Sequence, residues 1–123
     1  MNESELQEAI IEAARGFGWL VYHTHNSRRS EPGFPDLVMV NNRKVLFVEL
    51  KAEKGRLSEP QKVWQERLRR VEESEYYLWR PKDLEDAVNY LHKQRTSEVR
   101  GLGVRRSSWR RSPGGRMIEH QTL

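Results

Sequence analysis

The 123-residue chain contains no cysteine, so neither a disulfide framework nor a thiolate zinc site is available to it. No apolar run approaches the roughly 18 residues that a membrane-spanning helix needs. The first residues are polar and acidic, which is not the pattern of a signal peptide. We therefore expect a soluble, intracellular, single-domain protein with a modest core and no membrane contact.

A basic excess is missing from most of the chain. Residues 1–94 hold 15 Lys plus Arg against 16 Asp plus Glu, whereas residues 95–123 hold 7 against 2. The net charge of +4 therefore comes from the C-terminal segment. If the first 94 residues attract nucleic acid, local arrangement of charges must do it rather than their total.

Charged residues border two apolar runs in the middle of the chain. Residues 37–40 and 45–48 read as buried strands, and the polar segment between them predicts a hairpin. Asp36 opens the first strand, while Glu49 and Lys51 close the second and share one face of it. We expect these three side chains to meet at one end of a sheet. Two acids and a lysine there favour a site that holds a hard divalent cation against a phosphodiester.

The remaining pattern predicts one α/β domain. A first helix is expected to begin at Ser4 as its cap and to end at Gly16 or Gly18. The other expected elements are a strand over residues 19–24, a helix with a capping box at residues 58–61, a strand over 76–79, and a helix over 84–91. The order is αβββαβα, a mixed sheet flanked by helices, in a domain of residues 1–94. No apolar face can be drawn through residues 95–123, which we expect to form a flexible basic tail.

From about Glu5 to Pro81 the chain resembles the PD-(D/E)XK nucleases, and among them the compact VRR-NUC group of bacteria, phages and some eukaryotic repair enzymes. The residues that carry the resemblance are Gly33-Phe34-Pro35-Asp36-Leu37, Glu49-Leu50-Lys51, Gly55-Arg56-Leu57-Ser58 and Gln61. The resemblance implies a restriction-endonuclease-like fold, Mg²⁺ as cofactor with Mn²⁺ as a substitute, and DNA as substrate. It also implies the cytoplasm of a bacterium or of a phage-infected cell.

The resemblance assigns roles within the site. It implies that Asp36, Glu49 and the backbone carbonyl of Leu50 bind the metal, and that an acid of the first helix completes the site. Glu5 matches the family pattern best and Glu8 is the alternative; for either, a solvated helix face is the competing interpretation. Gln61 is expected either to cap its helix only or to contact the attacking water or a ligand carboxylate.

Two roles are open to Lys51. As an ammonium it would orient the water and offset negative charge in the transition state, whereas as a neutral base it would need desolvation or a metal nearby. We favour the electrostatic role. The competing interpretation of Asp36, Glu49 and Lys51 together is a structural ion pair at the sheet edge.

A second group of residues is expected to contact the DNA backbone. Arginine and hydroxyl side chains bind phosphate without reading sequence, although a solvated loop is the alternative. His23 and His25 lie two residues apart on a predicted strand. Two histidines without a third ligand are only a weak indication of a zinc site. We favour a phosphate contact from His23 over zinc binding. The predicted DNA contacts are Ser27, Arg28, Arg29, Lys54, Arg56 and His23.

Three functions are compatible with the sequence. The favoured one is a homodimeric, Mg²⁺-dependent endodeoxyribonuclease that selects branched DNA such as Holliday-type junctions. The second is a phage or defence endonuclease that cuts duplex DNA without branch preference. The third is a non-catalytic DNA-binding module, which the combination of Asp36, Glu49, Lys51 and Gln61 disfavours.

Overall fold

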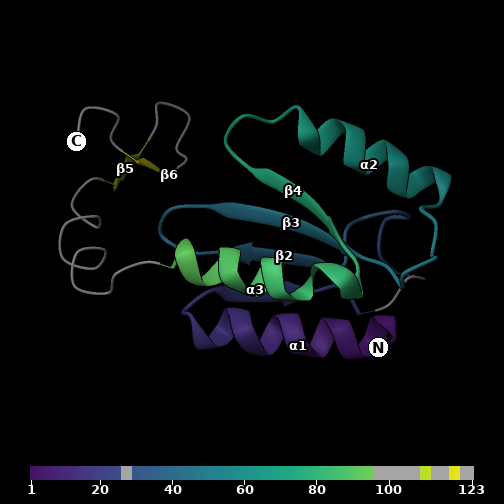
Figure 1. Ribbon diagram of the computed structural model, residues 1–123. Coiled ribbons are helices and arrows are strands. Elements are labelled where there is room, and N and C mark those ends of the chain that lie inside the picture. Colours follow the sequence, from purple (N-terminus) through teal and green to yellow (C-terminus); the bar gives the residue numbers. More distant parts are fainter. Residues whose placement is uncertain (26–28, 96–108, 112–116, 120–123) are drawn as a thin grey trace.

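The protein is described from a computed structural model that covers residues 1–25, 29–95, 109–111 and 117–119. Figure 1 shows the arrangement of its helices and strands. In chain order the main elements are α1 (Glu3–Gly16), β1 (Leu20–His23), β2 (Leu37–Val40), β3 (Val45–Leu50), α2 (Glu59–Arg69), β4 (Glu75–Trp79), the short 3-10 helix η1 (Pro81–Asp83) and α3 (Leu84–Lys93). This order confirms the predicted αβββαβα fold.

Four strands form one mixed sheet in the order β1-β2-β3-β4. The first three run antiparallel, and β4 runs parallel to β3. The register pairs Leu37 with Val48 and Leu50 with Trp79. Strand β3 is therefore bordered on both sides, which explains its nearly continuous burial and its unbroken apolar sequence.

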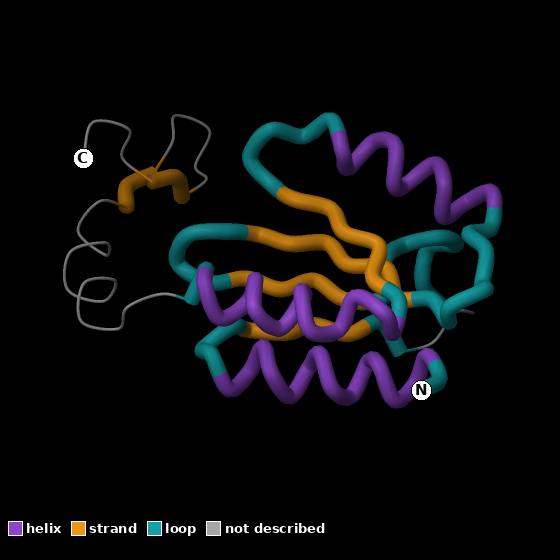
Figure 2. The backbone as a smooth tube through the Cα atoms, viewed as in Figure 1, coloured by secondary structure: helices purple, strands orange, loops and turns teal. Residues whose placement is uncertain are grey.

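Helices α1 and α3 lie beside each other against one face of the sheet, and α2 lies apart from them next to β4 (Figures 1 and 2). The core forms between the sheet and the α1–α3 pair. Trp64 of α2 packs edge-on against Phe34, which packs edge-on against Phe47 of β3. The buried core residues are Leu6, Ile10, Ala14, Trp19, Leu37, Met39, Leu46, Val48, Leu50, Trp79, Ala87 and Leu91.

The start of α1 differs from the prediction, because Asn2 and not Ser4 caps the helix. The Asn2 side chain accepts a hydrogen bond from the Glu5 backbone N–H at 2.8 Å. The Glu5 carboxylate in turn accepts one from the Asn2 backbone N–H at 2.8 Å. Asparagine and serine are both good N-caps, and a capping-box partner follows each of them at the third position, so the sequence pattern alone does not decide between them.

The C-terminal segment contains two short strands, β5 (Trp109–Arg111) and β6 (Met117–Glu119), which pair antiparallel. We predicted no regular element there, and three-residue strands are too short for alternation to reveal them. The rest of the predicted flexible tail lies outside the described residues, so its flexibility stays a prediction. Within the described part of the chain, no helix is long and apolar enough to cross a bilayer.

Candidate active site

Asp36 and Glu49 face each other across β2 and β3. Because Leu37 pairs with Val48 in an antiparallel ladder, the residue before Leu37 lies opposite the residue after Val48. The Asp36 carboxylate also accepts a hydrogen bond from the Leu50 backbone N–H at 2.8 Å. Glu49 is only 2% exposed. Two carboxyl groups and the backbone of Leu50 thus meet at one end of β3.

Burial raises the pKa of Glu49 to about 8, helped by the negative charge of Asp36 and by a hydrogen bond between the two side chains. The positive charge of Lys51 acts in the opposite direction and offsets only part of the increase. Without a cation, Glu49 therefore holds a proton at neutral pH. A carboxyl group kept in this environment is better suited to a metal ion than to a structural ion pair.

Gln61 contacts Glu49 and caps α2 with the same side chain. Its Nε2 donates to the Glu49 carboxylate at 2.9 Å, while its Oε1 accepts the Ser58 backbone N–H at 2.8 Å. The Ser58 hydroxyl accepts the Gln61 backbone N–H at 3.3 Å, which completes the predicted capping box. The two interpretations of Gln61 are therefore compatible, because the cap fixes the amide that reaches Glu49.

A close contact at Gly33 fixes where α2 begins. Gly33 has a positive φ of 85°, and a Cβ there would lie 2.4 Å from the Pro60 carbonyl carbon. Any side chain would thus force the loop before Asp36 away from the helix. The Trp64 indole N–H also donates to the Pro32 carbonyl at 3.1 Å. Together these contacts hold the first turn of α2, which carries Gln61, against the strand end with Asp36.

The structure brings Asp36 and Glu49 together, but Glu5 does not join them. The Glu5 carboxylate is occupied in the cap of α1, and the helix acid whose charge raises the pKa of Glu49 is Glu3. Among the described residues, no three His, Cys, Asp or Glu side chains gather as a metal site. The role of Glu5, or of Glu8 as its alternative, in metal binding stays a prediction.

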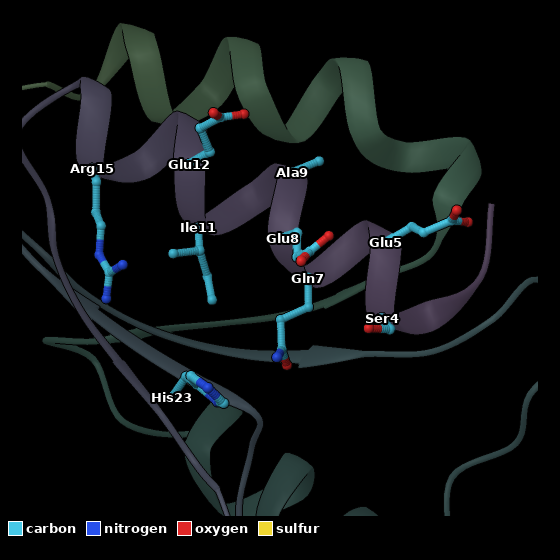
Figure 3. A pocket seen from close by; sticks show the side chains of 9 residues that line it. All are labelled: Ser4, Glu5, Gln7, Glu8, Ala9, Ile11, Glu12, Arg15 and His23. Carbon is cyan, nitrogen blue, oxygen red and sulfur yellow. The ribbon is translucent and has the colours of Figure 1, made fainter.

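His23 and His25 lie beside each other, with ring centroids 4.0 Å apart. The Nδ1 atom of His23 is buried and has no hydrogen-bond partner among the described residues. His23 borders a hollow of about 940 Å³ between β1 and α1, and the other lining residues all belong to α1 (Figure 3). In Figure 3, Gln7 extends towards the strand with His23, whereas Glu5 and Glu12 extend away from it.

Three of the predicted DNA contacts lie at the surface of the described part of the chain. Ser27 and Arg28 lie outside the described residues. Arg29, Lys54 and Arg56 are exposed, the last two in the loop that follows Lys51. Exposure next to the acid pair is compatible with phosphate binding, which stays a prediction for these residues.

Arg80 and Tyr76 belong to the surroundings of the site, although sequence reasoning did not select them. The Arg80 guanidinium donates to the carbonyl oxygens of Ala52, Glu53 and Gly55. Burial raises the pKa of Tyr76 to about 12, and the negative charge of Glu49 adds to the increase. Both residues lie at least 25 positions from the residues they influence, so only the pairing of β3 with β4 could have revealed them.

The family profile of the VRR-NUC domain matches residues 1–82. The chain belongs to the VRR-NUC family. This family is part of the restriction-endonuclease-like nuclease superfamily and typically uses a divalent metal, so membership implies a nuclease-type function in DNA processing.

A solved VRR-NUC domain has a similar fold, with a TM-score of 0.59 and 23% sequence identity. The match covers 72% of this chain and 95% of that domain. No curated protein matches the chain. At this identity the solved domain supports the fold alone, and the family profile carries the assignment.

Proposed function

We propose that this VRR-NUC protein is a metal-dependent endodeoxyribonuclease that hydrolyses phosphodiester bonds in branched DNA. The observation that supports this most is the buried Glu49 carboxyl, which lies opposite Asp36 and accepts a hydrogen bond from Gln61. Two acids in contact are costly in a domain of this size unless a cation is bound between them.

The residues present fit a divalent cation. Asp36 and Glu49 offer carboxylate oxygens at one point, and the Leu50 carbonyl follows directly in the chain. Hard cations such as Mg²⁺ and Mn²⁺ prefer such oxygen ligands, and they retain water where the protein supplies few. A bound Mg²⁺ would supply Lewis-acid stabilisation of the phosphate and an activated water. The raised pKa of Glu49 agrees with this fit, since a cation would replace the proton that Glu49 otherwise holds.

The chain's own groups account for the rest of the chemistry. Lys51 follows the acid pair on the same strand face as Glu49, so its ammonium offsets charge that develops on the phosphate. Gln61 holds the Glu49 carboxylate in one orientation. Asp36 is held by the Leu50 N–H, so both carboxylates are fixed before substrate arrives.

The small size of the fold supports selection of DNA by shape. The helices and strands described between residues 3 and 93 form one α/β unit, without a second unit among them that could read a base sequence. Two incisions across a symmetric junction need two active sites, whereas the chain holds one acid pair among its described residues. We therefore propose a homodimer. Its mass in solution, measured by light scattering with and without junction DNA, tests this part, and a monomer in both conditions contradicts it.

Cleavage of three labelled substrates tests the function. A four-way junction, a flap and a plain duplex of equal length are incubated with Mg²⁺, with Mn²⁺ and with a chelator. We expect cuts in both strands of the junction with either metal and none with the chelator. Equal cutting of all three substrates would favour the duplex-cutting alternative, and inactivity on all three would contradict the proposal.

A further inference from the structure

We infer that Arg80 is a positioning residue, whose guanidinium holds the loop after β3 and with it the Lys51 ammonium in place for cleavage. This inference rests on the proposed nuclease function. Arg80 follows β4, and it does not belong to the residues that carry the family resemblance.

Three backbone oxygens converge on one nitrogen of Arg80. Its Nη1 donates to the carbonyls of Ala52 and Gly55 at 2.7 Å each, and to that of Glu53 at 3.2 Å. These carbonyls form a single tight turn, which the Gly55 N–H closes onto the Ala52 carbonyl at 3.1 Å. A half-buried guanidinium therefore acts as the centre around which the turn folds.

The same turn lies close to Lys51. A Cβ added at Gly55 would lie 3.4 Å from Cδ of the Lys51 side chain, so the Gly55 backbone runs beside that side chain. The Lys51 backbone N–H donates to the Trp79 carbonyl at 3.1 Å. Lys51 and Arg80 thus occupy neighbouring positions at the ends of β3 and β4. If the Arg80 contacts were lost, the turn of residues 52–55 would be free to move, and the Lys51 side chain would no longer be held in one position.

The backbone of Arg80 is itself held. Its N–H donates to the Asp83 carboxylate at 2.8 Å, and its carbonyl accepts the Asp83 N–H at 2.8 Å. The guanidinium therefore extends from a fixed point towards the turn. All three contacts go to one terminal nitrogen, and the planar guanidinium fixes the direction of that nitrogen better than the flexible stem of a lysine would. The contacts thus favour arginine over lysine.

The test compares Arg80→Gln and Arg80→Lys with Arg70→Gln. Arg70 is an exposed arginine of the α2 C-terminus that pairs with Glu66 at 3.5 Å, so its replacement removes the same charge without touching the turn. Steady-state cleavage of the four-way junction with saturating Mg²⁺ gives kcat and KM. Hydrogen exchange of peptides that span residues 51–58 reports on the turn without any need for catalysis.

We expect Arg80→Gln to lower kcat about a hundred-fold with KM changed less than about two-fold, because a displaced group and not lost DNA affinity causes the effect. Exchange within residues 51–58 should accelerate while the rest of the sheet keeps its protection. Arg80→Lys should give intermediate values of both, and Arg70→Gln should match wild type.

Three results would overturn the inference: an unchanged kcat, a raised KM at unchanged kcat, or exchange that accelerates uniformly over the whole domain. The second would make Arg80 a DNA contact and the third a general stability residue. If wild type cuts no substrate, the proposed function fails. The exchange data then still decide whether Arg80 holds the turn.

Discussion

Two glutamates on neighbouring strands, Glu49 on β3 and Glu75 on β4, show how differently one protein can treat a carboxylate. Glu75 accepts hydrogen bonds from Lys44 at 2.6 Å, from the Tyr77 hydroxyl at 2.7 Å and from the Tyr90 hydroxyl. Burial acts to raise its pKa, but these hydrogen bonds outweigh burial and lower it below the usual value. Burial raises the pKa of Glu49 to about 8, and the negative charge of the neighbouring Asp36 adds to the increase.

The comparison contrasts a carboxylate that is held by hydrogen bonds with one that we propose to bind a metal. The partners of Glu75 come from the turn just before β3, from β4 and from α3, so Glu75 ties the start of the two parallel strands to a helix. The surroundings of Glu49, at the opposite end of the same strands, instead favour its protonated form until a cation binds. A pKa raised by burial together with a neighbouring charge is typical of a functional site.

Replacing Lys51 tests the charge balance at the Glu49 end. We expect Lys51→Ala to lower kcat about a hundred-fold, which corresponds to about 3 kcal/mol of transition-state stabilisation. The melting temperature should change little, because the aliphatic part of Lys51 is only half-buried. Lys62→Ala serves as the control, since Lys62 is 57% exposed and pairs only with Glu59. Equal rates for the two variants would remove Lys51 from the mechanism.

Replacing Glu75 tests the opposite end. Glu75→Gln should lower the free energy of unfolding by about 2 kcal/mol, because three donors lose a charged acceptor. Chemical denaturation measures this loss. Cleavage at temperatures well below the transition should continue at the wild-type rate, and a stable but inactive variant would contradict the division of roles.

The contribution of Glu75 should also depend on pH. Because its pKa is lowered in the folded protein, its stabilisation is present above the unfolded value, near 4.5, and is lost as the pH falls through the lower folded value. The stability difference between wild type and Glu75→Gln should therefore shrink as the pH is lowered below about 4.5. A difference that is constant from pH 7 to pH 3 would contradict the assigned contacts.

The smallest expected effects concern Gln61, which caps α2 and also donates a hydrogen bond to Glu49. Ser58→Ala removes one cap contact and should lower stability by about 1 kcal/mol while cleavage continues. Gln61→Ala should lower stability by a similar amount and also lower kcat, because the hydrogen bond to Glu49 is lost. Parallel denaturation and cleavage assays give both quantities. Equal kcat values for the two variants would reduce Gln61 to a cap.

Local pattern was sufficient to predict most of the fold and the meeting of Asp36 with Glu49. The meeting of the two acids depends on a short hairpin, in which neighbours in sequence are neighbours in space. The same holds for the capping box of Ser58 and Gln61, which lie three residues apart. This part of the site was predictable because its residues lie close together in the sequence.

Contacts that join distant segments could not be predicted in this way. Arg80 donates to carbonyls that lie 25 to 28 residues earlier in the chain. The parallel pairing of β3 with β4 brings these residues close together in space. The choice among the acids of α1 likewise depends on which one the cap occupies. Glu5 fills that role, whereas the charge of Glu3 reaches Glu49.

Junction cleavage by Glu49→Gln and Glu75→Gln, measured side by side with Mg²⁺ below the melting temperature of each, tests the central claim most directly. We expect Glu49→Gln to be slowed about a thousand-fold or more, since it removes a metal ligand from the transition state, and Glu75→Gln to match wild type. Cleavage by Glu49→Gln at the wild-type rate would show that the acid pair does not drive hydrolysis.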